Sequence, residues 1–153
     1  MTIETKISIL LVRGDFIMKN GKILVHLDGS KCDENIIPKV EELAGGEKEG
    51  ICLLKVVSAR AFPGVDPKKI VQEAEQYLQG FENRLRAKGF DVDTRIRYGD
   101  DVEEILDHAA QTDIGLIAIS AHGRGGIKRF LFGSMAEKVL RHTTKPVFLV
   151  WCG

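Results

Sequence analysis

Residues 114–126 read Ile-Gly-Leu-Ile-Ala-Ile-Ser-Ala-His-Gly-Arg-Gly-Gly, and Gly133-Ser134 follow shortly after them. The apolar segment 114–119 is typical of a strand that is covered on both faces in a parallel sheet. Ser134 is followed three residues later by Glu137, a spacing typical of a capping box, so we expect Ser134 to open a helix. The stretch therefore predicts a strand, a glycine-rich loop and a helix in succession.

A helix that begins after a glycine-rich loop predicts a cradle for phosphate groups. Glycine allows the backbone to approach a ligand closely, and the first turn of a helix offers unpaired N–H groups and a partial positive charge. Between residues 123 and 145 six basic residues oppose one acidic residue: Arg124, Lys128, Arg129, Lys138, Arg141 and Lys145 against Glu137. Residues 28–49 instead carry seven acidic residues and three lysines. The alternative interpretation is a solvated loop before an ordinary capped helix.

The rest of the chain repeats the succession of strand and helix. Apolar or alternating runs predict strands at residues 22–27, 51–57, 90–98, 114–119 and 147–151. Four helical patterns lie between them. Parallel strands joined by helices require right-handed crossovers, so we predict an α/β fold with helices on both faces of a parallel sheet. Ligands bind such sheets beyond the carboxyl ends of the strands, where Asp28 is either a turn residue or an acceptor for a ligand hydroxyl or amine.

Prolines and one glycine give local expectations for the first two helices. The first helix is predicted to begin near Asp33, with Pro38 in its first turn, because proline further inside a helix breaks the hydrogen-bond ladder. Asp66 and Pro67 have the types preferred for an N-cap and a first helical residue. Gly80 lies inside the second helix, where glycine costs about 1 kcal/mol relative to alanine, so we expect close packing there.

The N-terminal residues precede the first convincing strand. The apolar run 7–12 is too short for the core of a signal peptide and lacks a small-residue cleavage site. Residues 1–17 are interpreted as an appended edge strand or as upstream sequence foreign to the domain. We therefore divide the chain into an N-terminal extension, residues 1–19, and one domain, residues 20–153.

Composition excludes several functional classes. The 153 residues suit one domain, and 22 basic residues balance 22 acidic residues, so we expect no electrostatic binding of nucleic acid. No apolar run approaches the roughly 18 residues that cross a membrane. The three cysteines, Cys32, Cys52 and Cys152, are odd in number and have no C-x-x-C spacing, so we expect reduced thiols in a cytoplasmic protein.

Several catalytic motifs are absent from the sequence. There is no phosphate-binding G-x-x-x-x-G-K-[ST] loop, no G-x-G-x-x-G after the first strand and no histidine spacing typical of a metal site. His122 alone among the histidines lies beside the glycines, where it either braces the loop or contacts a ligand. No nucleophile and base occupy matching strand ends. We therefore expect no enzyme, leaving weak ATP hydrolysis open.

The spacing of these glycines resembles that of the universal stress protein family. The family signature is Gly, two residues, Gly, nine residues and then Gly-Ser or Gly-Thr; Gly123 and Gly133-Ser134 match its second and third parts. The flanking matches are the segment 22–30, strand residues 53–56, Gly99 and Lys145-Pro146-Val147. The resemblance covers about residues 20–151.

The resemblance implies a five-stranded sheet of order 3-2-1-4-5, as in adenine nucleotide alpha hydrolase-like folds. It implies a homodimer through antiparallel pairing of the last strand, with Val147, Leu149, Val150 and Trp151. One branch of the family binds ATP, here with Mg, and another binds no nucleotide. Asp28 and Val56 would contact adenosine, and the phosphates would be lined by Gly123, Arg124, Gly133, Ser134 and Met135. The neighbouring strand-end residues of the site are Leu27, Ile119 and Ser120.

Some positions depart from the family pattern. Ser120 replaces the first signature glycine and could crowd the ribose, and His26 stands where a small residue is common and could enter the adenine pocket. Gly115 occupies a position that is often Asp, and Asp101 one that is usually proline. Three hypotheses stay open: an ATP-binding homodimeric stress module, an interaction protein of the same fold without nucleotide, and an ATP-hydrolysing or nucleotidyl-transfer enzyme.

Overall fold

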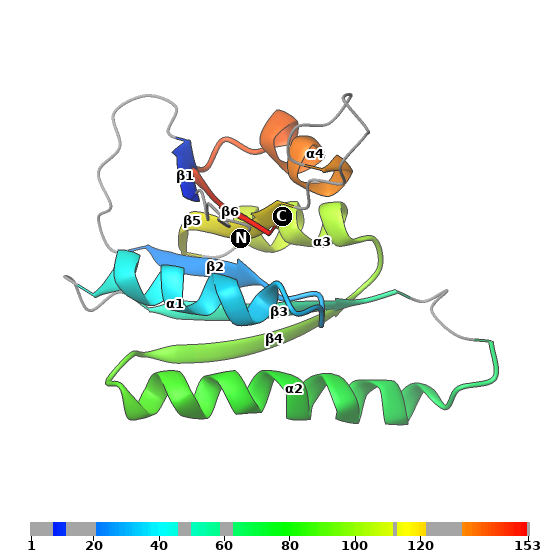
Figure 1. Cartoon of the computed structure of the whole chain (residues 1–153). Coiled ribbons are helices and arrows are strands. Elements are labelled where there is room, and N and C mark those ends of the chain that lie inside the picture. The colour runs from blue at the N-terminus through cyan, green and yellow to red at the C-terminus, as the bar shows by residue number, and fades with distance from the viewer. Residues whose placement is uncertain are drawn as a thin grey trace, which may run out of the picture.

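A computed structural model describes residues 8–11, 21–45, 50–58, 63–111, 113–121 and 133–152. Strands and helices alternate along these segments, as Figure 1 shows. The elements are β1 (Ser8–Leu11), β2 (Lys22–His26), α1 (Asp33–Ala44), β3 (Ile51–Val57), α2 (Pro67–Ala87), β4 (Val92–Tyr98), α3 (Asp101–Gln111), β5 (Ile114–Ala121), α4 (Ser134–His142) and β6 (Val147–Trp151).

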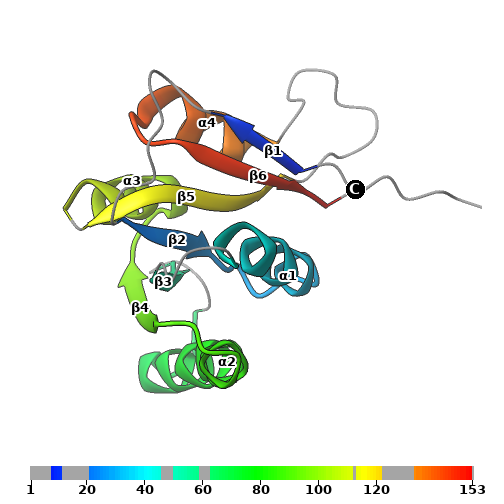
Figure 2. The same ribbon diagram turned by 90° about the vertical axis from the view of Figure 1, so that its left-hand side faces the viewer.

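The sheet has the strand order β1-β6-β5-β2-β3-β4. The five strands β2 to β6 are all parallel to their neighbours and lie in the predicted order 3-2-1-4-5. The predicted fold class is therefore confirmed. β1 adds a further strand, antiparallel to β6, at one edge. Figure 2 shows the sheet twisting from β1 at one edge to β4 at the other.

Two apolar layers hold the helices on the two faces of the sheet. The layer under α1 and α2 contains Ile23, Val25 and Leu27 of β2. The layer under α3 and α4 contains Leu24 of the same strand and Ile117 of β5. Side chains alternate between the faces of a strand, so a strand covered on both faces is apolar at nearly every position. β4 lies at the open edge and keeps one polar face, with Asp93, Arg95 and Arg97 there.

Two local expectations about helices are wrong. α1 begins at Asp33 as predicted, but Pro38 is its sixth residue and lies beyond the first turn. Its missing N–H leaves the carbonyl of Glu34 without an intrahelical partner, and Glu34 and Pro38 are both exposed, so water can reach this part of the helix. Gly80 does not mark close packing, because a Cβ there would have no atom within 4 Å. The predicted Asp66 cap is confirmed: its carboxylate accepts a hydrogen bond from Lys68 N at 3.0 Å.

Close packing of glycine occurs instead between β2 and β5. A Cβ on Gly21 would lie 2.5 Å from the Cα of Gly115, and a Cβ on Gly115 would lie 3.1 Å from the Cα of Gly21. The pairing of β2 with β5 shifts register immediately after this contact, between Lys22 and Ile23. The glycine at 115, where the family often has Asp, therefore has a packing reason in this chain.

The outer edge of β6 is not open in this structure. β1 pairs with β6 from Ser8 opposite Val150 to Leu11 opposite Val147. The edge that the sequence suggested for a homodimer is thus already occupied by a strand of the same chain. No helix in the described part of the chain is long and apolar enough to cross a membrane.

Alanine at the two glycines should change stability in opposite directions. Gly21→Ala should lower the free energy of unfolding by about 1–3 kcal/mol, because the new methyl group meets the backbone of β5. Gly80→Ala should raise it by about 1 kcal/mol, because the exposed helix position gains propensity without a clash. Urea unfolding of both variants beside the parent chain tests this, and a stable Gly21→Ala variant would contradict the close approach.

Candidate functional site

The carboxyl ends of the parallel strands gather the predicted site residues at one edge of the sheet. β2 ends before Leu27 and Asp28, β3 ends at Val57, and β5 ends at Ala121. α1 and α4 begin at this same edge because each follows a parallel strand through a loop. Gly123, Arg124 and His122 lie outside the described residues.

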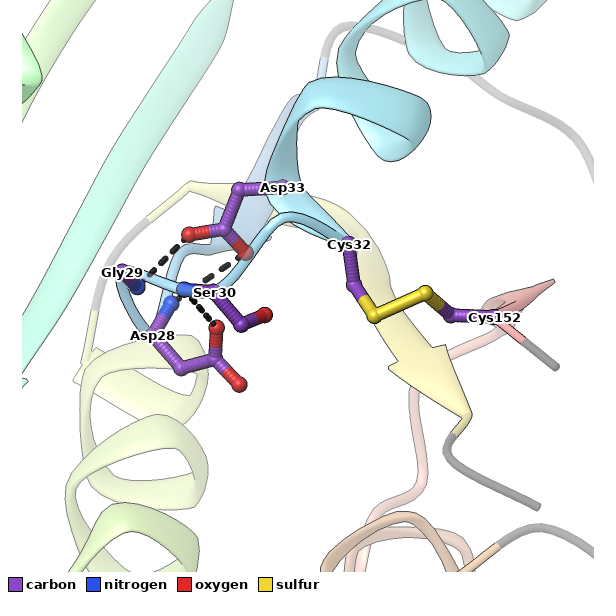
Figure 3. The surroundings of a disulfide bond; sticks show 6 residues. All are labelled: Asp28, Gly29, Ser30, Cys32, Asp33 and Cys152. Carbon is purple, nitrogen blue, oxygen red and sulfur yellow. Dashed lines mark hydrogen bonds between the residues drawn. A yellow bond between two sulfur atoms is a disulfide. The ribbon is translucent and has the colours of Figure 1, made fainter. Parts of the chain in front are cut away.

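The loop after β2 is held by two carboxylates (Figure 3). Asp33 accepts hydrogen bonds from the backbone N–H of Gly29 at 2.7 Å and of Asp28 at 3.3 Å. The carboxylate of Asp28 accepts a hydrogen bond from Ser30 N at 2.8 Å, which makes Asp28 a turn residue. Its side chain is nevertheless exposed at the edge of the sheet. The loop thus presents Asp28 to solvent on a backbone that Asp33 fixes.

Asp33 is almost completely buried, with 1% of its surface exposed. Burial raises the pKa of its carboxyl to about 6, against the opposing effect of hydrogen bonds from Tyr77 and the backbone. Tyr77 of α2 donates its hydroxyl hydrogen to Asp33 Oδ2, and burial also raises the pKa of this phenol. Lys55 of β3 lies 5.5 Å from the centre of the Tyr77 ring.

This Asp33–Tyr77–Lys55 group was missed by the sequence analysis. Tyr77 lies at helical spacing with the apolar residues Ala74, Leu78 and Phe81, and Asp33 was predicted as a helix start, so neither residue needs a partner to account for its place in the sequence. The contact joins residues that are 44 positions apart. The polar groups of Asp33 and Tyr77, each next to apolar residues of its helix, were the available sign that the two side chains meet.

α4 begins one residue earlier than a capping box requires. Gly133 is the N-cap, with φ of 85°, and Ser134 is already the first helical residue. Gly133 has no side chain to cap the helix and Ser134 does not occupy the N-cap position, so the predicted capping box is wrong. The N–H of Glu137 bonds to the carbonyl of Gly133 at 3.1 Å. The first-turn N–H groups from Ser134 onward are therefore left without an acceptor from a capping side chain.

The predicted strand-end residues divide between the two faces of the sheet. Val56, Ile119 and Met135 belong to the layer on the α3 and α4 face. Leu27 belongs to the opposite layer, and Ser120 follows the alternation of Ala118 onto that same α1 face. His26 is one residue before Leu27, so by the alternation of the strand it faces the α3 and α4 side. The two family departures, Ser120 and His26, are both buried and lie on opposite faces.

Cys32 and Cys152 form a disulfide, so the expectation of reduced thiols is wrong for this pair. Cys32 is the N-cap residue of α1, and Cys152 directly follows β6; their Cα atoms are 5.7 Å apart (Figure 3). The sequence hides the pair because 120 positions separate them. The fold joins them because α1 packs over β5 and β6 at the carboxyl edge.

Cys52 remains a free thiol in the core. Its Sγ lies 3.6 Å from His108 Nε2, and burial raises the pKa of the thiol to about 12. Burial also lowers the pKa of His108, so the ring is held neutral beside an uncharged thiol. A thiol in this state is a poor nucleophile, and the pair therefore offers no catalytic thiolate.

The same neighbourhood contains a polar cavity of about 280 Å³ at the amino edge of the sheet. Lys22 and Arg95 both pair there with Asp93, at 3.3 and 3.4 Å. Arg97, further along β4, bridges Glu104 at 2.5 Å and Asp107 at 2.6 Å on α3. The pairs of Asp93 lie at the amino end of β4, opposite to Asp28, whereas Arg97 is paired with Val56 near the carboxyl end of the strand and ties β4 to α3. Among the described residues no group of three His, Cys, Asp or Glu side chains is placed to hold a metal ion.

Comparison with known proteins agrees with this architecture. A sequence model of the Universal stress protein family matches residues 19–150. Universal stress protein YxiE of Bacillus subtilis is 26% identical over 145 residues, covering 85% of this chain and 98% of that protein. Universal stress protein MJ0577 of Methanocaldococcus jannaschii is 30% identical over 151 residues, covering 84% and 93%.

Solved structures show the same fold. That of MJ0577 superposes with a TM-score of 0.75 at 28% identity, covering 87% of this chain and 96% of that chain. The universal stress protein from Archaeoglobus fulgidus in complex with dAMP gives a TM-score of 0.63 at 20% identity, covering 88% and 99%.

The raised pKa of Asp33 predicts a specific dependence of stability on pH. The folded state binds a proton at Asp33 near pH 6, whereas the unfolded state binds it near pH 4. The stabilisation that the protonated Asp33 gives the folded state is therefore fully present below pH 4, and it is lost as the pH rises through 6. Between pH 7 and pH 4 the parent should gain about 2 kcal/mol of unfolding free energy relative to Asp33→Asn, which does not titrate. If the unfolding free energies of the two chains changed equally with pH, this would contradict the burial of an ionisable Asp33.

The bond between Cys32 and Cys152 should stabilise the fold, and this stabilisation should be lost when the two cysteines are reduced. A double variant, Cys32→Ser with Cys152→Ser, should unfold with about 3–5 kcal/mol less free energy than the oxidised parent, because the unfolded chain regains the entropy of a long closed loop. Dithiothreitol should destabilise the parent and leave the double variant unchanged. Equal stability of the oxidised parent and the double variant would show that the bond does not constrain the chain.

Proposed function

This chain belongs to the universal stress protein family, and from that premise we propose that it is a nucleotide-binding module that holds ATP at the carboxyl edge of its sheet. The observation that carries the proposal is the start of α4. There the N-cap is Gly133, with φ of 85°, which offers no capping side chain, at the same edge as the exposed Asp28.

The adenosine would lie toward the β2 end of this edge. Asp28 can accept a hydrogen bond from a ribose hydroxyl, and Asp33 keeps the loop that carries it in place. Val56 at the end of β3 offers apolar contact for the base. The complex of the Archaeoglobus fulgidus protein with dAMP supports the binding of an adenine nucleotide by this fold. The acidic residues around Asp28 repel phosphate, which orients the nucleotide with its phosphates away from β2.

The phosphates would lie at the α4 start, near Gly133, Ser134 and Met135. Backbone N–H groups of a first helical turn and the helix dipole both favour an anion. Ser134 is exposed there, so its hydroxyl can donate to a phosphate oxygen. Mg, when bound with ATP, would neutralise phosphate charge; the chemistry of the edge fits a metal carried by the phosphates, since the described residues supply no ligand cluster.

The module would act by binding and by contacts with partners, without catalysis. The buried thiol of Cys52 is held uncharged, and the described residues bring no three metal-ligating side chains together. The second candidate function is an interaction protein that binds no nucleotide. Its support is the pair of buried residues His26 and Ser120 at positions where the family has smaller ones.

Thermal unfolding with Mg-ATP, and with AMP as the control, tests the proposal. A ligand at 100 times its dissociation constant adds about 2.7 kcal/mol to the folded state, which raises the melting temperature of a domain of this size by several degrees. We expect a larger rise with ATP than with AMP, because only ATP extends to the α4 start. No rise with either ligand would reject nucleotide binding in favour of the interaction protein.

Valine at Gly133 separates the phosphate end from the adenosine end. A β-branched residue does not adopt φ of 85°, so Gly133→Val should displace the helix start and weaken ATP binding at least tenfold. AMP binding should change much less. Gly80→Val, at an exposed site on α2, is the matched control and should leave both affinities unchanged. Unchanged ATP affinity in Gly133→Val would show that the phosphates lie elsewhere.

A further inference from the structure

The added strand β1 completes the sheet at the edge of β6. Four residue pairs join them in antiparallel register: Ser8 with Val150, Ile9 with Leu149, Leu10 with Phe148 and Leu11 with Val147. Figure 2 shows β1 lying along β6, beyond the five parallel strands. The family match begins at residue 19, so β1 lies outside the segment that the family shares.

The hydrogen bonds of β6 to β5 show which backbone groups face β1. Pro146 accepts from Ile117 N at 3.0 Å, and Cys152 N donates to the carbonyl of Ala121 at 2.9 Å. Backbone groups alternate in direction along a strand, so even-numbered residues of β6 face β5. Val147 and Leu149 therefore direct their N–H and C=O groups outward. Their partners in β1 are Leu11 and Ile9, which must direct their own groups toward β6.

Without β1 this edge of β6 would be an open pairing surface. The strand is apolar on both faces, and residues 147–150 are at most 7% exposed, so its side chains are buried in the core. Such an edge is a template for another strand. A second copy of β6 fits it, because antiparallel pairing of identical strands is two-fold symmetric and closes after two copies. The pairing of β1 shows that this edge of β6 accepts an antiparallel strand, as pairing with a second copy of β6 requires.

We infer that β1 and the β6 strand of a second copy compete for the same outward N–H and C=O groups, so that β1 restrains self-association of the chain. Only nine residues separate β1 from Gly21. A short connection keeps a strand at an effective concentration on the order of millimolar, well above the concentration of a free second copy. β1 is nevertheless only four residues long, so its pairing can be exchanged for that of a longer strand. This inference does not depend on nucleotide binding.

Proline scanning of β1 in the full chain tests the competition. Ile9→Pro removes an N–H that faces β6 and should release β1. Leu10→Pro is the matched control, because its N–H faces away from β6 and proline is tolerated at such edge positions. Sedimentation equilibrium over a micromolar concentration series gives the association constant of each chain. We expect the parent and Leu10→Pro to remain monomeric, and Ile9→Pro to dimerise at least tenfold more tightly.

A second chain, residues 18–153, begins at the natural Met18 and lacks β1 altogether. It should dimerise like Ile9→Pro, and circular dichroism confirms that each variant is folded before its association is interpreted. Should Ile9→Pro fail to fold, this shortened chain decides the question. Equal dimer association constants in all four chains would show that β1 does not block pairing at the edge of β6. Monomers in both Ile9→Pro and the shortened chain would show that β6 is not a surface for a second copy.

Discussion

The parallel pairing of β2 with β3 on one side and with β5 on the other is the constraint on which the rest of the structure depends. A strand hydrogen-bonded at both edges and covered on both faces has to be apolar, and Ile23, Leu24 and Val25 have no exposed surface. Parallel neighbours also require a crossover helix for each connection. Every carboxyl end is thereby brought to one edge of the sheet. The contact of Gly21 with Gly115 shows how closely the two central backbones meet where this pairing starts.

The start of α1 is held at that edge from two directions. On one side Asp33 ties the backbone of Asp28 and Gly29 to Tyr77 on α2. On the other side Cys32 links the same helix start covalently to the end of β6. The first attachment requires a carboxylate in a buried place, which raises its pKa, and the second depends on the redox state of two thiols. The loop that carries Asp28 is therefore fixed by groups that respond to pH and to reductants.

The two edges of the sheet are protected from pairing with other strands in different ways. β4 ends the sheet on one side and carries a polar face, where Arg97 pairs with Glu104 and Asp107 of α3. β6 is apolar on both faces and is buried, so its free edge would attract another strand. Here a short strand from the N-terminal extension covers it. The same core thus has one edge protected by charge and one protected by backbone pairing.

The sequence by itself determined the five parallel strands, their order through the family resemblance, and the helix starts at Asp33 and Pro67, because these follow from local apolar periodicity and from capping and proline chemistry. It also indicated which loops meet at the ligand-binding edge, since all parallel strands point one way. The tertiary structure decided what depends on distant neighbours. It paired Cys32 with Cys152, buried Asp33 against Tyr77, moved the cap of α4 to Gly133 and placed β1 on β6. Each of these depends on which distant residues the fold brings together, and local periodicity shows which face of an element is buried but not which residue it meets.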